Sequence, residues 1–148
     1  MSSKQPQAFY ISLKVLVCRG SFVLALRSVG PGVFHGAFDL PGGRASLKDH
    51  DPESTIYREL GEELGPVRFH LVPTPIALTF TDLVGIGAIA YAFYVAEYES
   101  GEIKISREHD NFEWVLLSIR SLNRFAPALR PGVKALLELR DEYAQNVA

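Results

Sequence analysis

The chain has 148 residues, of which 47% are hydrophobic and 22% are charged, and its formal net charge at pH 7 is −2. This is an ordinary globular composition, and the length predicts a single domain over residues 1–148. The small net charge gives no reason to expect binding to a nucleic acid polymer or to an anionic membrane, although a local basic pocket stays open. The longest apolar run, residues 83–96, is shorter than the about 20 residues that a membrane-spanning helix needs.

The cysteine content and the N-terminus favour a cytoplasmic location. The single cysteine, Cys18, lies in an apolar alternating stretch and cannot form an intramolecular disulfide. Residues 1–5 contain no apolar signal segment, and residues 1–7 are polar and predicted to be disordered. Both features indicate a reducing compartment.

The first part of the chain predicts three strands. In residues 8–18, the side chains of Tyr10, Ser12 and Lys14 alternate with apolar ones, which is typical of a half-buried strand. Residues 22–27 would return beside it as the second strand of a hairpin. The next residues predict a flexible loop at 28–32 and a brief strand at 38–40 that leads into Pro41-Gly42-Gly43.

A helix is predicted next, from about residue 52 to residue 64. Asp51 can accept a hydrogen bond from the amides of the first turn, and Pro52 suits the first helical position because its missing N–H costs nothing there. Gly65 followed by Pro66 ends the helix. The boundaries therefore rest on local residue chemistry alone.

The predicted helix carries two different faces. At ~100° per residue, Glu59, Glu62 and Glu63 share one side, while three apolar residues share another. A solvated face rich in glutamate is common, since like-charged neighbours there cost only ~0.2–0.5 kcal/mol per pair. If the cluster is partly buried behind the glycine-rich segment, its repulsion calls for a cation, and hard oxygen ligands of this kind suit Mg²⁺ or Mn²⁺.

After the helix, strand patterns continue until a final helix. Strands are predicted at residues 67–72, 76–81, 86–98, 103–106 and 112–117, and an amphipathic helix at 131–146. Mixed strands with two helices predict an α/β sandwich.

The central stretch resembles the box of the Nudix hydrolase family, G-x5-E-x7-R-E-U-x-E-E-x-G-U, where U is an aliphatic residue. Here the box spans residues 43–66, and Arg58-Glu59-Leu60-Gly61-Glu62-Glu63-Leu64-Gly65 matches its second half. The first half departs from the pattern, because Gly43 lies one residue too far from Arg58 and the loop glutamate is missing. Counting from either end of the loop places Asp49 or His50 at that position, and the last position is Pro66 instead of an aliphatic residue.

The resemblance implies a fold, a reaction and a metal. The fold is an α/β/α sandwich with a mixed sheet and a C-terminal helix. The reaction is the hydrolysis of a diphosphate bond in a nucleoside diphosphate linked to another group, a small-molecule substrate, with Mg²⁺ or Mn²⁺. Glu59 and Glu63 are the implied direct ligands, with Glu62 a direct or water-mediated ligand and the carbonyl of Gly43 completing the set. Arg58 would orient a glutamate.

Other residues become candidates in this frame. Asp49 can take the place of the loop glutamate as the partner of Arg58, whereas His50 carries no firm charge near neutral pH. Glu108 is a candidate general base or further metal ligand, so the catalytic set is Glu62, Glu63, Arg58 and Glu108. Phosphate contacts are expected from Arg27 and Arg44. The aromatic residues considered for stacking a base are Phe34, Phe38, Phe80 and Trp114, with Phe38 ranked first.

Several alternatives remain open. A non-catalytic Nudix domain that senses a nucleotide is motivated by the altered loop, and a coenzyme A pyrophosphatase by the length of that loop. Isomerisation of a prenyl diphosphate needs a reactive cysteine, whereas Cys18 falls in a predicted interior strand. Homodimer formation is also left open. The expected activity is broad and modest, because stacking on an aromatic ring tolerates different bases.

Overall fold

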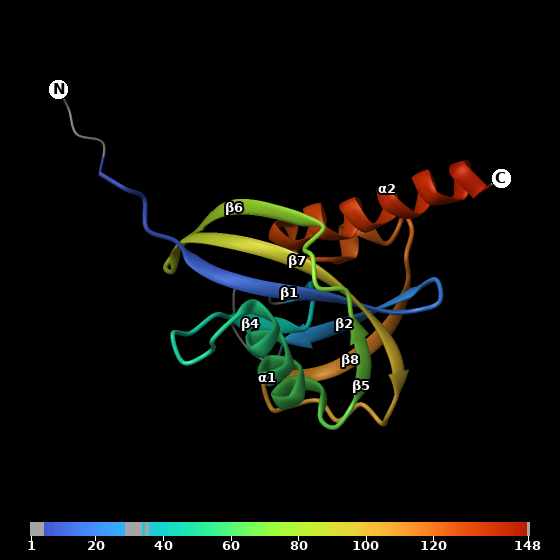
Figure 1. Cartoon of the computed structure of the whole chain (residues 1–148), viewed down its shortest axis with the longest axis horizontal. Coiled ribbons are helices and arrows are strands. Elements are labelled where there is room, and N and C mark those ends of the chain that lie inside the picture. The colour runs from blue at the N-terminus through green and yellow to red at the C-terminus, as the bar shows by residue number, and fades with distance from the viewer. Residues whose placement is uncertain (1–4, 29–33, 35, 148) are drawn as a thin grey trace.

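The computed structural model of the chain describes residues 5–28, 34 and 36–147. The predicted loop at 28–32 lies mostly outside these residues, as do the first four residues of the predicted disordered segment. In the described part, a mixed sheet separates two helices, and these helices lie on opposite sides of it (Figure 1). This arrangement confirms the predicted fold class, with a mostly stranded sheet and a C-terminal helix.

The strands are β1 (Tyr10–Arg19), β2 (Phe22–Ser28), β3 (Phe38–Asp39), β4 (Gly42–Arg44), β5 (Arg68–Leu71), β6 (Ala77–Leu83), β7 (Gly87–Ser100) and β8 (His109–Leu116). β1 and β7 lie side by side in parallel at the centre, with Tyr10 opposite Ile89. The other pairings are antiparallel: β2 with β1, β3 and β8, β4 with β1, and β7 with β5 and β6. β1 thus touches both the central strand and the glycine segment.

Helix α1 (Pro52–Leu64) has the predicted boundaries. The backbone N–H of Ser54 donates to the Asp51 carboxylate at 2.7 Å, and the N–H of Gly65 donates to the Gly61 carbonyl at 3.2 Å. Gly65 adopts a φ of 76°, a backbone conformation that residues with a Cβ rarely adopt. Local capping chemistry therefore sets both ends of this helix.

Two predictions of secondary structure were wrong. Residues 103–106 form no strand, because the N–H of Lys104 donates to the carbonyl of Leu64 (2.9 Å) and that of Ser106 to the carbonyl of Glu63 (3.1 Å). They cap the end of α1 instead of joining the sheet. Residues 42–44, expected as a loop, form β4 and pair with β1.

The core has two parts, one on each face of the sheet. On one face, Ile56, Leu60 and Leu64 of α1 pack against apolar side chains of β1 and β2. On the other, Val133 and Leu136 of α2 (Arg130–Val147) pack around Phe93 of β7. In the part of the chain described here, no helix is long and apolar enough to cross a membrane.

Candidate functional site

The site begins where β4 passes beneath α1. Gly43 lies so close to the helix that a Cβ on it would come within 2.5 Å of the carboxyl carbon of Glu59. The residue opposite Gly43 on β1 is Leu13, so the glycine is held in place by strand pairing. A glycine is required here for close approach of the backbone to the carboxylate.

Glu63 is the second carboxylate at this place, and it is only 5% exposed. The N–H of Gly42 donates to its Oε2 at 3.3 Å. Burial raises the pKa of Glu63 to about 8, against the opposing effect of the Lys14 ammonium. Without further positive charge, this carboxyl group therefore tends to hold its proton near neutral pH.

Lys14 and Asp39 form a buried ion pair next to Glu63. The Nζ of Lys14 donates to Asp39 Oδ1 at 3.0 Å and to the carbonyl of Leu40 at 3.2 Å. His109 lies on the other side, with its Nε2 3.6 Å from Asp39 Oδ2. Burial opposes both charges, but their attraction prevails, so the pKa of Lys14 is raised and that of Asp39 is lowered.

Sequence reasoning missed this pair. The alternation in β1 placed Lys14 on a polar face, yet the residue is 7% exposed. The available signal was a lysine flanked by a long apolar run, Leu13 and Val15 to Val17, in a strand with buried neighbours. Such a charge is rarely buried without a partner.

Arg58 connects the loop to the helix. Its Nη2 donates to Asp49 Oδ2 at 2.8 Å and its Nε to Asp49 Oδ1 at 3.0 Å, a two-point contact. Nη1 donates to Glu59 Oε1 at 2.9 Å. The hydrogen bonds from Arg58, and to a smaller extent the one from Thr55, hold the pKa of Asp49 well below its usual range. The expected contact with Asp49 is thus present, while His50 is exposed.

Two further candidates lie outside this close arrangement. The side chain of Glu62 is 62% exposed, and its Oε1 lies 3.8 Å from Arg58 Nη1. Glu108 is exposed in the turn before β8, and its carboxylate makes no hydrogen bond or ion pair within the described residues. The structure therefore brings Glu59 and Glu63 together, with Glu62 at the rim and Glu108 apart.

The arginines and Phe38 are distributed over two cavities. Arg44 lines a cavity beside Gly43, with its guanidinium 4.9 Å from the centre of the Tyr10 ring. Arg27 lines another, of about 230 Å³, and stacks over Phe38 at 5.3 Å. Phe38 is 3% exposed and contributes to the core, and it also lines this second cavity. Its role in stacking a base stays a prediction.

Among the other aromatic candidates, Phe34 reaches the cavity beside Gly43. Phe80 is largely exposed and contacts Phe9, with ring centres 5.0 Å apart. Trp114 lies beneath the guanidinium of Arg19 at 4.3 Å. Of the four aromatic candidates, Phe34 is therefore the one that lines the cavity beside Gly43.

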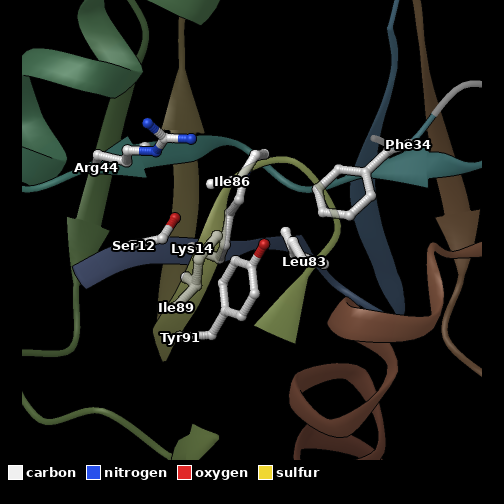
Figure 2. A pocket seen from close by; sticks show the side chains of 9 residues that line it. Ser12, Lys14, Phe34, Arg44, Leu83, Ile86, Ile89 and Tyr91 are labelled. Carbon is white, nitrogen blue, oxygen red and sulfur yellow. The ribbon is translucent and has the colours of Figure 1, made fainter. Parts of the chain in front are cut away.

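The cavity beside Gly43 has a volume of about 190 Å³. Ser12, Lys14 and Tyr91 contribute its polar groups from β1 and β7, and Arg44 and Phe34 stand on opposite sides of it (Figure 2). Gly43 lines this cavity and also lies against the Glu59 carboxylate, so the cavity and the carboxylate adjoin at this glycine.

The donor groups at Gly43 fit a hard divalent cation. Carboxylate oxygens are the ligands that Mg²⁺ prefers, and the cradle at Gly43 brings Glu59 against the backbone. A cation would also stabilise the ionised form of the buried Glu63. Within residues 5–28, 34 and 36–147, no three acidic, histidine or cysteine side chains form a ready metal cluster, so a third carboxylate such as Glu62 would have to turn inward.

A sequence model of the NUDIX domain matches residues 10–136, which include the sheet, α1 and the start of α2. The chain therefore belongs to the NUDIX domain family, and the predicted membership of the Nudix hydrolases is confirmed. A search of curated protein sequences gives no match.

Solved structures show the same fold at low sequence identity. The E. coli ORF135 protein has a TM-score of 0.70 and 19% identity, over 89% of this chain and 91% of that one. A MutT NUDIX hydrolase from Burkholderia pseudomallei has a TM-score of 0.68 and 20% identity, over 87% and 98%. An ADP-ribose pyrophosphatase from Streptococcus suis has a TM-score of 0.65 and 15% identity, over 90% and 92%.

Proposed function

We propose that the protein hydrolyses a diphosphate bond in a nucleoside triphosphate or another nucleoside diphosphate derivative, with Mg²⁺ or Mn²⁺ bound at Glu59 and Glu63. The observation that carries this proposal is the position of these two carboxylates against Gly42 and Gly43. Gly43 also lines a cavity that contains two cationic side chains, Lys14 and Arg44. Both cations suit a ligand with negative charge.

The chain's own residues would share the work. Glu59 and Glu63 would hold a divalent ion, which would supply positive charge for phosphate oxygens and lower the pKa of a bound water. Arg58 holds Glu59 against β4 through the contact at 2.9 Å. Glu62 is exposed beside them and would receive the proton of the attacking water at its carboxylate. The attack breaks the bond between that phosphorus and the bridging oxygen, which leaves with the second product.

Two alternatives to this function are a nucleotide sensor without turnover and a coenzyme A pyrophosphatase. The sensor was motivated by the altered loop. The contact between Asp49 and Arg58 supports the proposal that Asp49 takes the place of the missing glutamate. All three helical carboxylates are present, which favours the enzyme. The coenzyme A alternative still rests on loop length alone. Glu108 as a catalytic residue, the homodimer and the cytoplasmic location stay predictions.

The experiment is a panel of nucleoside triphosphates, nucleotide sugars, dinucleotides and coenzyme A, with products measured in Mg²⁺ and in EDTA. We expect turnover of several nucleotides with Mg²⁺ and none in EDTA. Binding without turnover of any compound would favour the sensor. A preference of more than about a thousandfold for one compound would contradict the expected breadth, and coenzyme A as that compound would select the pyrophosphatase alternative.

A further inference from the structure

One of the residues that line the cavity beside Gly43 is a lysine with an N–H donor that is unpaired in the part of the chain that the structure describes. An ammonium group has three N–H donors. Two of those on Lys14 are taken by Asp39 at 3.0 Å and by the carbonyl of Leu40 at 3.2 Å. The third has no acceptor among the described residues, and Lys14 lines the cavity. The ion pair with Asp39 fixes the position of the Lys14 ammonium group, so its remaining N–H donor is held in place before a ligand binds.

Two hydroxyl groups accompany this lysine. Ser12 precedes it by two residues on the same face of β1, and Tyr91 lies opposite Ser12 on β7. The Tyr91 hydroxyl points into the cavity (Figure 2). Within the described part of the chain, neither hydroxyl makes a hydrogen bond to another residue. Both groups are thus free to contact a ligand beside Lys14.

The rest of the lining suits a flat, apolar ring. Leu83, Ile86 and Ile89 form aliphatic walls, and the Phe34 ring stands at one side (Figure 2). Among the described residues that line the cavity, none is an acid or an amide. The polar contacts therefore come from two cations and two hydroxyls, which serve acceptor groups of a ligand better than donor groups.

We propose that this cavity binds the base of the substrate and favours a base with a ring carbonyl, such as guanine, hypoxanthine or uracil, over adenine. Lys14 is then the specificity-determining residue. A carbonyl oxygen accepts from its free N–H, and lysine pairs in this way with the O6 and N7 of guanine in nucleic acids. The amino group of adenine is a donor and would face a cation. The inference rests on the proposed function, because it assumes a nucleotide substrate.

The proposed preference narrows the range of bases that stacking alone would accept. The base would lie beside Gly43, and the phosphates of the nucleotide would then extend toward Glu59 and Glu63. A phosphate group is the other ligand with suitable acceptors, because Lys14 and Arg44 are both cationic. The two occupants are distinguished by adding inorganic pyrophosphate, which offers phosphate without a base.

The test measures binding by calorimetry in EDTA, so that it does not depend on turnover. Inosine monophosphate and adenosine monophosphate are compared, because their bases differ at the position of the carbonyl. We expect the inosine compound to bind at least about tenfold more tightly. The preference should disappear in the double variant Lys14→Met/Asp39→Asn, which removes both buried charges, and shrink in Tyr91→Phe, which keeps the ring.

Lys134→Met, an exposed lysine on α2, is the matched control and should keep the preference. Equal binding of the two nucleotides to the unaltered protein would overturn the proposal, as would an undiminished preference in the folded double variant. Displacement of inosine monophosphate by pyrophosphate in EDTA would overturn it in favour of a phosphate site.

The hydrolysis panel separates this inference from the proposed function. Turnover of GTP and ATP with equal binding of the two monophosphates would overturn the base preference alone. A preserved preference with no turnover of any compound would support the base site and contradict the hydrolase.

Discussion

Two ion pairs flank the glycine segment of β4, and they differ in their contact with water. Lys14 and Asp39 lie on one side with both side chains largely buried. Arg58 and Asp49 lie on the other, and the arginine is more than a third exposed. Losing one member of a buried pair leaves an uncompensated charge, whereas water can solvate an exposed partner. The first pair should therefore matter for stability, and the second mainly for the position of Glu59.

The two pairs also differ in how far apart their members lie in the sequence. Asp49 and Arg58 are 9 residues apart and were linked by the spacing of the box. Lys14 and Asp39 are 25 residues apart, and they meet only because β3 and β4 return beside the first two strands.

The largest effect is expected from Gly43→Ala. The added Cβ would meet the Glu59 carboxyl group at 2.5 Å, and because this is the end of a flexible side chain, the carboxylate should move while the fold remains. A displacement of about 1 Å at a reacting centre can cost about a hundredfold in rate. Hydrolysis by the variant should fall by at least that factor.

Gly61→Ala is the control, since a Cβ there meets nothing within 4 Å. It should keep its rate and gain about 0.5–1 kcal/mol of stability, because alanine loses less conformational freedom in a helix. A normal rate in Gly43→Ala would show that Glu59 needs no such close approach.

For the buried pair, Lys14→Met should lower the free energy of unfolding by ~3–5 kcal/mol, because Asp39 is left buried without its partner. The double variant Lys14→Met/Asp39→Asn should lose less than this single variant. Urea unfolding of the unaltered protein, both single variants and the double variant gives the coupling. Additive losses would mean that the pair does not act as a unit.

The pKa of Glu63 predicts a pH dependence in metal-free protein. Its value is raised from 4.5 to about 8 in the folded state, so between these limits the unfolded chain has released a proton that the folded chain retains. The free energy of unfolding should therefore fall as pH rises through this window. Urea unfolding in EDTA should show a flatter profile for Glu63→Gln. Identical profiles would mean that burial does not raise this pKa.

The smallest effect is expected from Asp49→Asn. The amide oxygen can still accept from Arg58, but the charge and the two-point contact are lost. For a residue that orients a metal ligand, we expect a fall in rate of about tenfold. The neighbouring His50→Gln should leave the rate unchanged, and equal rates in both variants would mean that the loop needs no carboxylate here.

The fold was predictable where local chemistry decides. Asp51, Pro52 and Gly65 carry the boundaries of α1 in their own side chains and backbone preferences. β4 was not predictable in this way, since Gly42 and Gly43 have no preference for strands and are paired by β1. Residues 103–106 have strand-forming side chains, but the free carbonyls at the end of α1 take their amides.

The site divides along the same line. Glu59, Glu63 and Arg58 could be found from the helix and the box. Lys14 and Tyr91 could not, because they meet through the parallel pairing of β1 with β7, which depends on the whole sheet. Arg27 and Phe38 were predicted to bind the substrate, and both line a different cavity from the one beside Gly43.

The central claim is that Glu59 and Glu63 form a metal centre over Gly43. Titration with Mn²⁺, followed by the electron paramagnetic resonance signal of the free ion, tests it without a substrate. We predict one site in the unaltered protein, at least about tenfold weaker in Glu63→Gln. It should be unchanged in Glu53→Gln, an exposed glutamate in the first turn of the same helix. Equal Mn²⁺ affinity in all three proteins would contradict the account.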